Sequence, residues 1–263
     1  MMSMAMGSRY PSSRLVSPAQ ASEWLGAGWR DMWRHPGLSL GFGALYAGIG
    51  ATIYAILTAA AMGALLFPLL AGFMLVGPLA AVFFYEISRR VENGEPVSLA
   101  LVVAGVRRRL GQVGNMGLVL TILFMVWLLL GLMIFALFHP PGAPLSMDGF
   151  LVDVVLKVDS IGFLAVGALV GGTLAVIAFS VSVFAMPMLL ERDVGVVEAM
   201  LFSVHSVWRN WRGMVGWAAT IAVITFFGMA LAFLGMVVAL PLVGHASWHA
   251  YRDVIGEDVG STL

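Results

Sequence analysis

The sequence contains 51 consecutive residues, 35–85, without a single charged side chain. A bilayer core is crossed by roughly 20 helical residues, so this stretch is too long for one transmembrane helix. A helical hairpin with its turn near residues 60–63 is the arrangement we predict. A second uncharged stretch of 39 residues, 213–251, predicts another hairpin that turns around residues 233–236. Stretches of this length and composition indicate a membrane protein.

The overall composition supports that class. Hydrophobic residues make up 60% of the 263 positions and charged residues 11%, whereas soluble domains carry about 25% charged residues. The formal net charge is zero and no basic run is interleaved with aromatic residues, so we expect no nucleic-acid partner. The absence of Cys excludes disulfides, thiolate catalysis and metal sites with Cys ligands.

Two further apolar segments lie between the hairpins. A third span covers roughly residues 114–138 and a fourth covers residues 161–190. Residues 1–16 are polar and predict a disordered N-terminal lead, and residues 254–263 predict a C-terminal tail. We therefore predict an all-α, polytopic integral membrane protein with six transmembrane helices in residues 17–253.

An amphipathic helix precedes each pair of spans. The most regular of the three lies within residues 191–217, where apolar residues share one helical face at i, i+4 and i+7 spacing. This face consists of Val197, Leu201, Val204, Trp208 and Trp211. The second copy has the same spacing at Leu99, Val103, Val106, Leu110 and Val113, and the first copy matches in part at Leu25, Trp29 and Met32. The sequence thus predicts three repeats, each an interfacial amphipathic helix plus a helical hairpin.

The placement of arginine predicts the orientation. Of the 14 basic residues, 13 are Arg, and they fall in the N-terminal segment, in the segments with amphipathic helices or near the C-terminal end. The opposite side holds Lys157 with Asp148, Asp153 and Asp159. Short loops rich in Arg stay cytoplasmic, so both termini should lie inside. Two termini on the same side require an even number of spans, a condition that four spans satisfy as well as six. The length of the uncharged stretches favours six.

The Trp and Arg side chains of the amphipathic helices suit two roles. In the first role, which we favour, Trp anchors the helices at the membrane interface and Arg marks the cytoplasmic side of the membrane. The alternative is a docking surface for a partner protein or for anionic lipid headgroups.

Five histidines are the candidate ligands of a metal or haem: His35, His139, His205, His245 and His249. His245 and His249 lie at i and i+4, which can present two imidazoles on one helical face. A metal site needs further ligands and groups that orient them, and that helical turn holds no carboxylate before Arg252. We assign no catalytic, cofactor-binding or metal-binding residue, and whether His245 and His249 bind anything stays open.

The acidic residues nearest the spans lie at the ends of the spans. Glu86, Glu191, Asp193 and Glu198 all fall at or beyond the predicted cytoplasmic ends. Charged groups at the bilayer centre usually mark ion or proton pathways. Their absence argues against a proton-coupled transporter and leaves passage of a neutral or apolar substrate open.

Small residues favour close packing of helices within this protein. Gly167 and Gly171 form a GxxxG pattern, whose glycines let two helix backbones approach closely. We expect this contact to be intramolecular, with the seam of a homo-oligomer as the alternative.

Three segments resemble a known family. They are residues 186–193 (MPMLLERD) with their continuation to Trp211, residues 29–33 (WRDMW) and residues 247–253 (SWHAYRD). Together they resemble the bacterial integral-membrane family catalogued as domain of unknown function 2189, over roughly residues 24–253. The resemblance implies a protein of the inner membrane of Gram-negative bacteria without an established activity.

Two functions follow as hypotheses. The first is a non-enzymatic inner-membrane protein that serves as accessory, scaffold or assembly partner of a larger membrane complex, because no nucleophile and base are placed together. The alternative is a transporter or lipid-handling protein for a neutral or apolar substrate, because internal repeats are common in transporters. A cavity between the repeats would favour the alternative, and a fully packed bundle would count against it.

Overall fold

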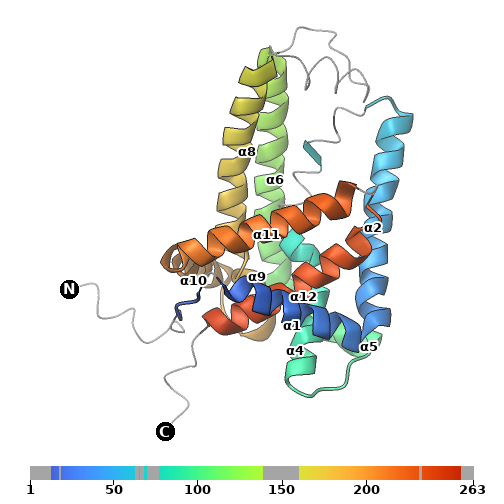
Figure 1. Cartoon of the computed structure of the whole chain (residues 1–263), viewed down its shortest axis with the longest axis vertical. Helices are drawn as coiled ribbons and strands as arrows, with labels where there is room; N and C mark the ends of the chain where they lie inside the picture. Colours follow the sequence, from blue (N-terminus) through green and yellow to red (C-terminus); the bar gives the residue numbers. More distant parts are fainter. Residues whose placement is uncertain are drawn as a thin grey trace, which may run out of the picture.

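The computed structural model describes residues 13–17, 19–62, 65, 68–69, 77–138, 160–230 and 233–255 (Figure 1). This part of the chain is helical, which confirms the all-α class. Its helices are α1 (Gln20–Arg34), α2 (Pro36–Ala59), α4 (Val82–Glu92), α5 (Leu99–Arg108), α6 (Leu110–Phe138), α8 (Ile161–Ser182), α9 (Ala185–Glu191), α10 (Val196–Arg209), α11 (Trp211–Ala230) and α12 (Met236–Val254).

Four helical segments in the described residues are long and apolar enough to cross a membrane. They are α2, α6, α8 together with α9, and α11. These segments match the first, third, fourth and fifth predicted spans and confirm a polytopic membrane protein. The other two predicted spans are not confirmed, and neither is the three-repeat architecture. Most of residues 63–76, where the second span was predicted to begin, lie outside the described part, and the sixth span corresponds to α12.

The helices α2, α6 and α8 rise away from one end of the molecule, and α6 and α8 lie side by side (Figure 1). They are apolar on all sides, as expected for helices surrounded by lipid. Only five of the 29 residues of α6 are buried, and four of these lie in its first eleven residues. In the same view, α11 and α12 run obliquely to the upright helices.

The helix α12 lies in the core, against α1, α2, α4 and α11. Twelve of its 19 residues are buried. Two glycines allow the close approach: a Cβ atom on Gly28 of α1 would lie 2.6 Å from the backbone nitrogen of Ala246, and one on Gly244 would lie 2.6 Å from the Phe84 ring. The contact surfaces of α12 therefore leave no room for larger side chains at these positions.

The short helices α1, α4, α5, α9 and α10 gather at the end from which the upright helices rise (Figure 1). The predicted apolar face of α10 points outward, with exposed fractions of 70% for Val197 and 82% for Trp208. The opposite face is buried and carries small and polar residues, including Ser203 and Ser206. An outward apolar face with Trp suits a helix that lies in a membrane interface.

The second amphipathic helix differs from the third. Leu99, Val103 and Leu110 are exposed, whereas Val106 and Val113 of the same predicted face are buried. The residues that share the spacing in the sequence therefore do not share one environment. This difference is one reason why the repeat is not confirmed.

The two ends of the described chain meet. Ser13 and Ile255 form an antiparallel β-bridge, and the Arg14 amide donates to the Val254 carbonyl at 2.8 Å. The Asn210 side chain accepts from the Val16 amide at 2.9 Å. The two ends of the described chain therefore lie together. These bonds hold part of the segment 13–16, and the remainder of the predicted lead and most of the predicted tail, residues 1–12 and 256–263, lie outside the described part.

Both predicted hairpin turns coincide with residues of positive φ that are not glycine. Ala61 has a φ of 56° and Phe233 a φ of 67°. The chain thus ends α2 and enters α12 close to the predicted positions. Gly63, His139 and Lys157 lie outside the described residues.

Candidate functional site

A chain of buried hydrogen bonds links α12 to three other helices. Ser39 of α2 lies 3.0 Å from Nε2 of His245, and Ser88 of α4 lies 2.8 Å from Nδ1 of the same ring. Ser88 also donates to Oδ2 of Asp31 in α1 at 2.8 Å, and His249 contacts that oxygen at 2.8 Å. Asp31 is 3% exposed, and Ser39, Ser88 and His245 are fully buried.

The directions of these bonds follow from the number of protons available. A serine hydroxyl has one proton, and Ser88 gives it to Asp31. Ser88 must therefore accept from Nδ1–H of His245, which leaves Nε2 to accept from Ser39. The neutral His245 ring thus uses both of its nitrogens. Burial raises the pKa of the Asp31 carboxyl, but the hydrogen bonds from His249 and Ser88 outweigh it, so the pKa lies below its ordinary value of 3.8.

This network contains a pairing that the sequence analysis missed. Asp31 is 57 residues from Ser88 and 218 from His249, so no local pattern indicates their contact. Ser39 beside His245 has the spacing of a nucleophile and a base, and both are fully buried. The network therefore fastens α12 to α1, α2 and α4.

The histidines are not gathered into a metal site in the described part of the chain, where no group of three or more potential ligands was found. His245 is occupied by two serines and His249 by Asp31. His35 lies between α1 and α2, and His205 is exposed on α10.

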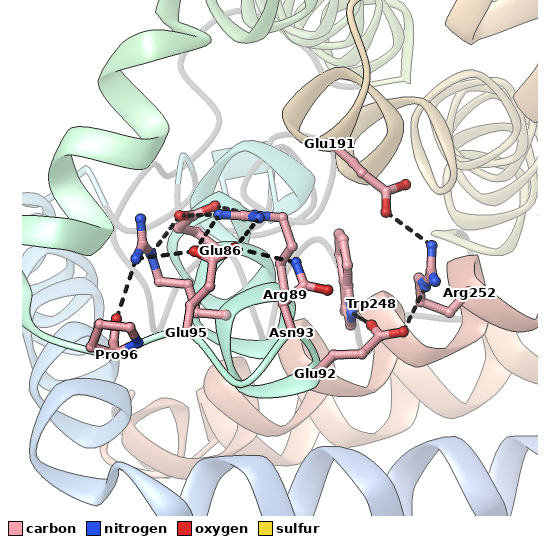
Figure 2. Close-up of polar contacts among 10 residues, drawn as sticks. Glu86, Arg89, Glu92, Asn93, Glu95, Pro96, Glu191, Trp248 and Arg252 are labelled. Carbon is pink, nitrogen blue, oxygen red and sulfur yellow. Dashed lines mark hydrogen bonds and ion pairs between the residues drawn. The ribbon is translucent and has the colours of Figure 1, made fainter.

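A second polar cluster surrounds Glu86 of α4 (Figure 2). The Glu86 carboxylate is 1% exposed and accepts from Arg89 at 2.9 Å and from Arg90 at 2.7 Å. Arg89 also donates to Glu95 at 3.0 Å, and this bond holds the pKa of Glu95 below its usual range. A buried carboxylate is thus compensated by two guanidinium groups.

The cluster continues to Glu191 at the end of α9 (Figure 2). Arg252 of α12 donates to Glu191 and to Glu92, each at 2.9 Å. Trp248 donates to Glu92 at 2.8 Å, and Tyr251 donates to Glu191 at 2.5 Å. Acidic residues predicted at the ends of spans therefore connect helices from different parts of the chain.

A cavity of about 470 Å³ lies on the other side of α12. One stripe of α12 lines it with Met236, Leu240, Val243 and Ser247, which follow helical spacing. The facing walls come from α8 and α11 and carry small residues. These are Gly171, Ala175 and Ala178 on α8 and Ala218, Ala219 and Ala222 on α11. Small side chains on facing helices leave this volume unfilled.

Part of the cavity wall is exposed on α8 and α11. Ala175 and Val176 of α8 and Ala219 of α11 line the cavity and are also exposed on the outer surface. Both helices are candidate spans.

The inner end of the cavity is polar without being charged. Tyr85 and Ser247 line it, and each carries a hydroxyl group. They are 3% and 4% exposed. None of the described lining residues is Asp, Glu, Lys, Arg or His, so the site suits an uncharged molecule.

The GxxxG glycines have different surroundings. A Cβ atom on Gly171 would lie 2.8 Å from the ring of Trp127 in α6, whereas one on Gly167 would meet nothing within 4 Å. The Trp127 indole donates to the Pro68 carbonyl at 2.8 Å. The predicted intramolecular contact is thus confirmed for Gly171 alone.

Comparison with known proteins supports the membrane class. The family model described as predicted integral membrane protein (DUF2189) matches residues 66–191. This match confirms the resemblance over a segment that holds Tyr85, Trp127 and α8, and it identifies an integral membrane protein similar to a family of unknown function. The motifs at residues 29–33 and 247–253 lie outside the match. Neither a curated protein nor a solved structure matches the chain.

Proposed function

We propose that this integral membrane protein binds a neutral, apolar molecule from the bilayer in the cavity between α8, α11 and α12, and that it acts without catalysis. The observation that carries the proposal is the uncharged cavity whose partly exposed wall belongs to two candidate spans, α8 and α11. Its volume of about 470 Å³ falls within the range of roughly 300–1,000 Å³ typical of small-ligand sites. The lipid-handling hypothesis is therefore preferred to the scaffold hypothesis.

The charge distribution supports a neutral ligand. The ionised groups described above, Asp31, Glu86 and Glu191 with their partners, lie among the short helices and on the faces of α12 turned away from the cavity. A charged group in an apolar site without a partner is costly. An apolar molecule dissolved in the bilayer enters such a site without losing hydration.

Native mass spectrometry of the protein extracted from its own membrane in mild detergent tests the proposal. We expect the wild type to retain a small-molecule adduct that Ala222→Trp, which fills the cavity, does not retain. Val223→Trp is the matched control, because Val223 neighbours Ala222 on α11 and is 54% exposed. A stoichiometric protein partner without any adduct would overturn the proposal in favour of an accessory or scaffold role.

We also propose that the protein resides in the bacterial inner membrane with six spans and both termini in the cytoplasm. The arginine-rich end of the molecule and the contact between Ser13 and Ile255 support this topology. Because the chain has no Cys, single-Cys variants test it cleanly. Leu234→Cys at the turn before α12 should react with a membrane-impermeant thiol reagent on intact cells, and Gly195→Cys only after permeabilisation. The reverse pattern would refute the orientation, and protection of Leu234→Cys until permeabilisation would refute the crossing by α11.

A further inference from the structure

We infer that the cavity selects a single-chain amphiphile with one uncharged hydrogen-bonding head, a hydroxyl or a carbonyl, which Tyr85 and Ser247 hold at the inner end. This inference rests on the proposed function and names the class of its ligand. An apolar ligand alone does not explain the site, because a pure hydrocarbon would make no hydrogen bond with the two hydroxyls.

The positions of the two hydroxyls support a head-group site. Tyr85 comes from α4 and Ser247 from α12, and both are almost completely buried where the cavity ends. Two hydroxyls carry two protons and four lone pairs between them. Both side chains line the same cavity, so donor and acceptor sites lie within reach of a ligand there. A hydroxyl head can both donate and accept there, and a carbonyl head can accept.

The cavity is unsuited to a charged head. The polar side chains of its described lining are Tyr85, Ser182, Thr225, Ser247 and the indole of Trp127, and the Trp127 indole is engaged by Pro68. Ser182 is fully buried and donates to the Ala178 carbonyl at 2.6 Å. A carboxylate or phosphate would have no cation beside it, and the cost of an unpaired buried charge is several kcal/mol or more.

The burial of the lining residues determines how the chain of the ligand would lie. Tyr85 of α4 and Ser247 of α12 are buried, whereas Val176 of α8 and Ala219 of α11 are exposed parts of the cavity wall. A molecule with its head at Tyr85 would therefore extend its tail past Ala222 toward the bilayer. The small residues on both walls give room for one alkyl chain.

Binding of three tritiated probes to the purified full-length protein in detergent tests the inference. The probes are 1-hexadecanol, hexadecane and hexadecyl phosphate, which share a chain and differ in the head. We expect hexadecanol to bind at least about 5-fold more tightly than either of the others, as one net hydrogen bond provides. Tyr85→Phe and Ser247→Ala should each remove about this preference and leave hexadecane binding unchanged. Tyr54→Phe, on the exposed side of α2, is the matched control.

The outcomes separate the inference from the proposed function. If Ala222→Trp abolishes binding while the three probes bind equally and Tyr85→Phe changes nothing, the head-group inference fails and the cavity site stands. If Ala222→Trp binds all probes as Val223→Trp does, both fail. Tighter binding of hexadecyl phosphate than of hexadecanol would overturn the inference directly. Thermal unfolding of each variant shows that a loss of binding is not a loss of fold.

Discussion

The end of the molecule that holds the short helices and the part that holds the apolar spans are built on different principles. Six of the seven residues of α9 and seven of the eleven residues of α4 are buried. In the most apolar windows of the four candidate spans, only 11% to 22% of residues are buried. The end that holds the short helices, called the polar end below, thus has a dense core of its own. The spans depend on lipid to cover them.

This difference indicates that the polar contacts among the short helices determine the fold more than contacts between the spans do. Lipid tails are as apolar as Leu, so burying one span against another gains little from the hydrophobic effect. Buried hydrogen bonds and ion pairs, in contrast, have one geometry that satisfies them. We therefore expect substitutions at the polar end to change stability strongly and substitutions on the outer surface of the spans to change it little.

The largest effect is expected for Glu86→Ala. Removal of one partner from a buried ion pair costs about 3–5 kcal/mol, because Arg90, at 7% exposure, would keep its charge without Glu86. Equilibrium unfolding in mixed micelles with increasing dodecyl sulfate measures the change. Glu23→Ala, at an exposed position of α1, is the control and should be nearly neutral. Equal losses in both variants would contradict the proposed difference between the two regions.

Two substitutions in α6 compare the effect on stability at a buried position near the polar end with the effect at an exposed position of the apolar span. Met116→Ala, at a fully buried position, should cost about 2–5 kcal/mol through the cavity that it creates. Leu129→Ala, at 68% exposure in the same helix, should change stability by about 0.5 kcal/mol or less. The same micelle titration measures both. Similar values for the two variants would show that the upper part of α6 is packed against protein.

The stability of the polar end depends on pH through the Asp31 carboxyl. Its pKa in the folded state lies below the ordinary value of 3.8, so its stabilising contribution is complete at pH values well above 3.8. That contribution is lost as the pH falls through the folded-state pKa. At neutral pH we expect Asp31→Asn to be less stable by about 1.5–3 kcal/mol, as for hydrogen bonds to a charged group. The difference between wild type and variant should shrink below pH 3.8, and a constant difference would argue against an ionised Asp31.

The smallest effect on stability is expected at Trp208. Trp208→Phe should change the free energy of unfolding by about 0.5 kcal/mol or less, because the side chain is 82% exposed on α10. In vesicles with brominated lipid, this variant should lose a strongly quenched part of the tryptophan fluorescence. Trp217→Phe should lose an unquenched part, because Trp217 is fully buried. Equal quenching of both residues would exclude an interfacial position for α10.

Much of the helical framework was predictable, because runs of uncharged residues reflect a local requirement of the bilayer. The end of α2, the start of α8, the end of α9 and the turn at Phe233 follow from such runs. The role of α12 was not predictable in this way. Its first ten residues are as apolar as a span, and only contacts with α1, α2 and α4 reveal that it lies in the core.

The candidate sites depended on contacts that no local pattern contains. His245 and His249 were recognised as a pair, but Asp31, the partner of His249, comes from the other end of the chain. The cavity exists because small residues, such as Ala175 on α8 and Ala222 on α11, face each other across it. Alanines are so common in membrane helices that their spacing alone does not distinguish a cavity wall from a packing face.

The position of α12 in the core has a consequence for biosynthesis. The ribosome makes α12 after every other helix described here, so Asp31, Ser39 and Ser88 leave it long before His245 exists. The earlier spans therefore enter the bilayer with these polar groups still in contact with water or with insertion factors. Final assembly waits until α12 has been made, and a chain interrupted before residue 236 exposes a surface that quality-control proteases can recognise.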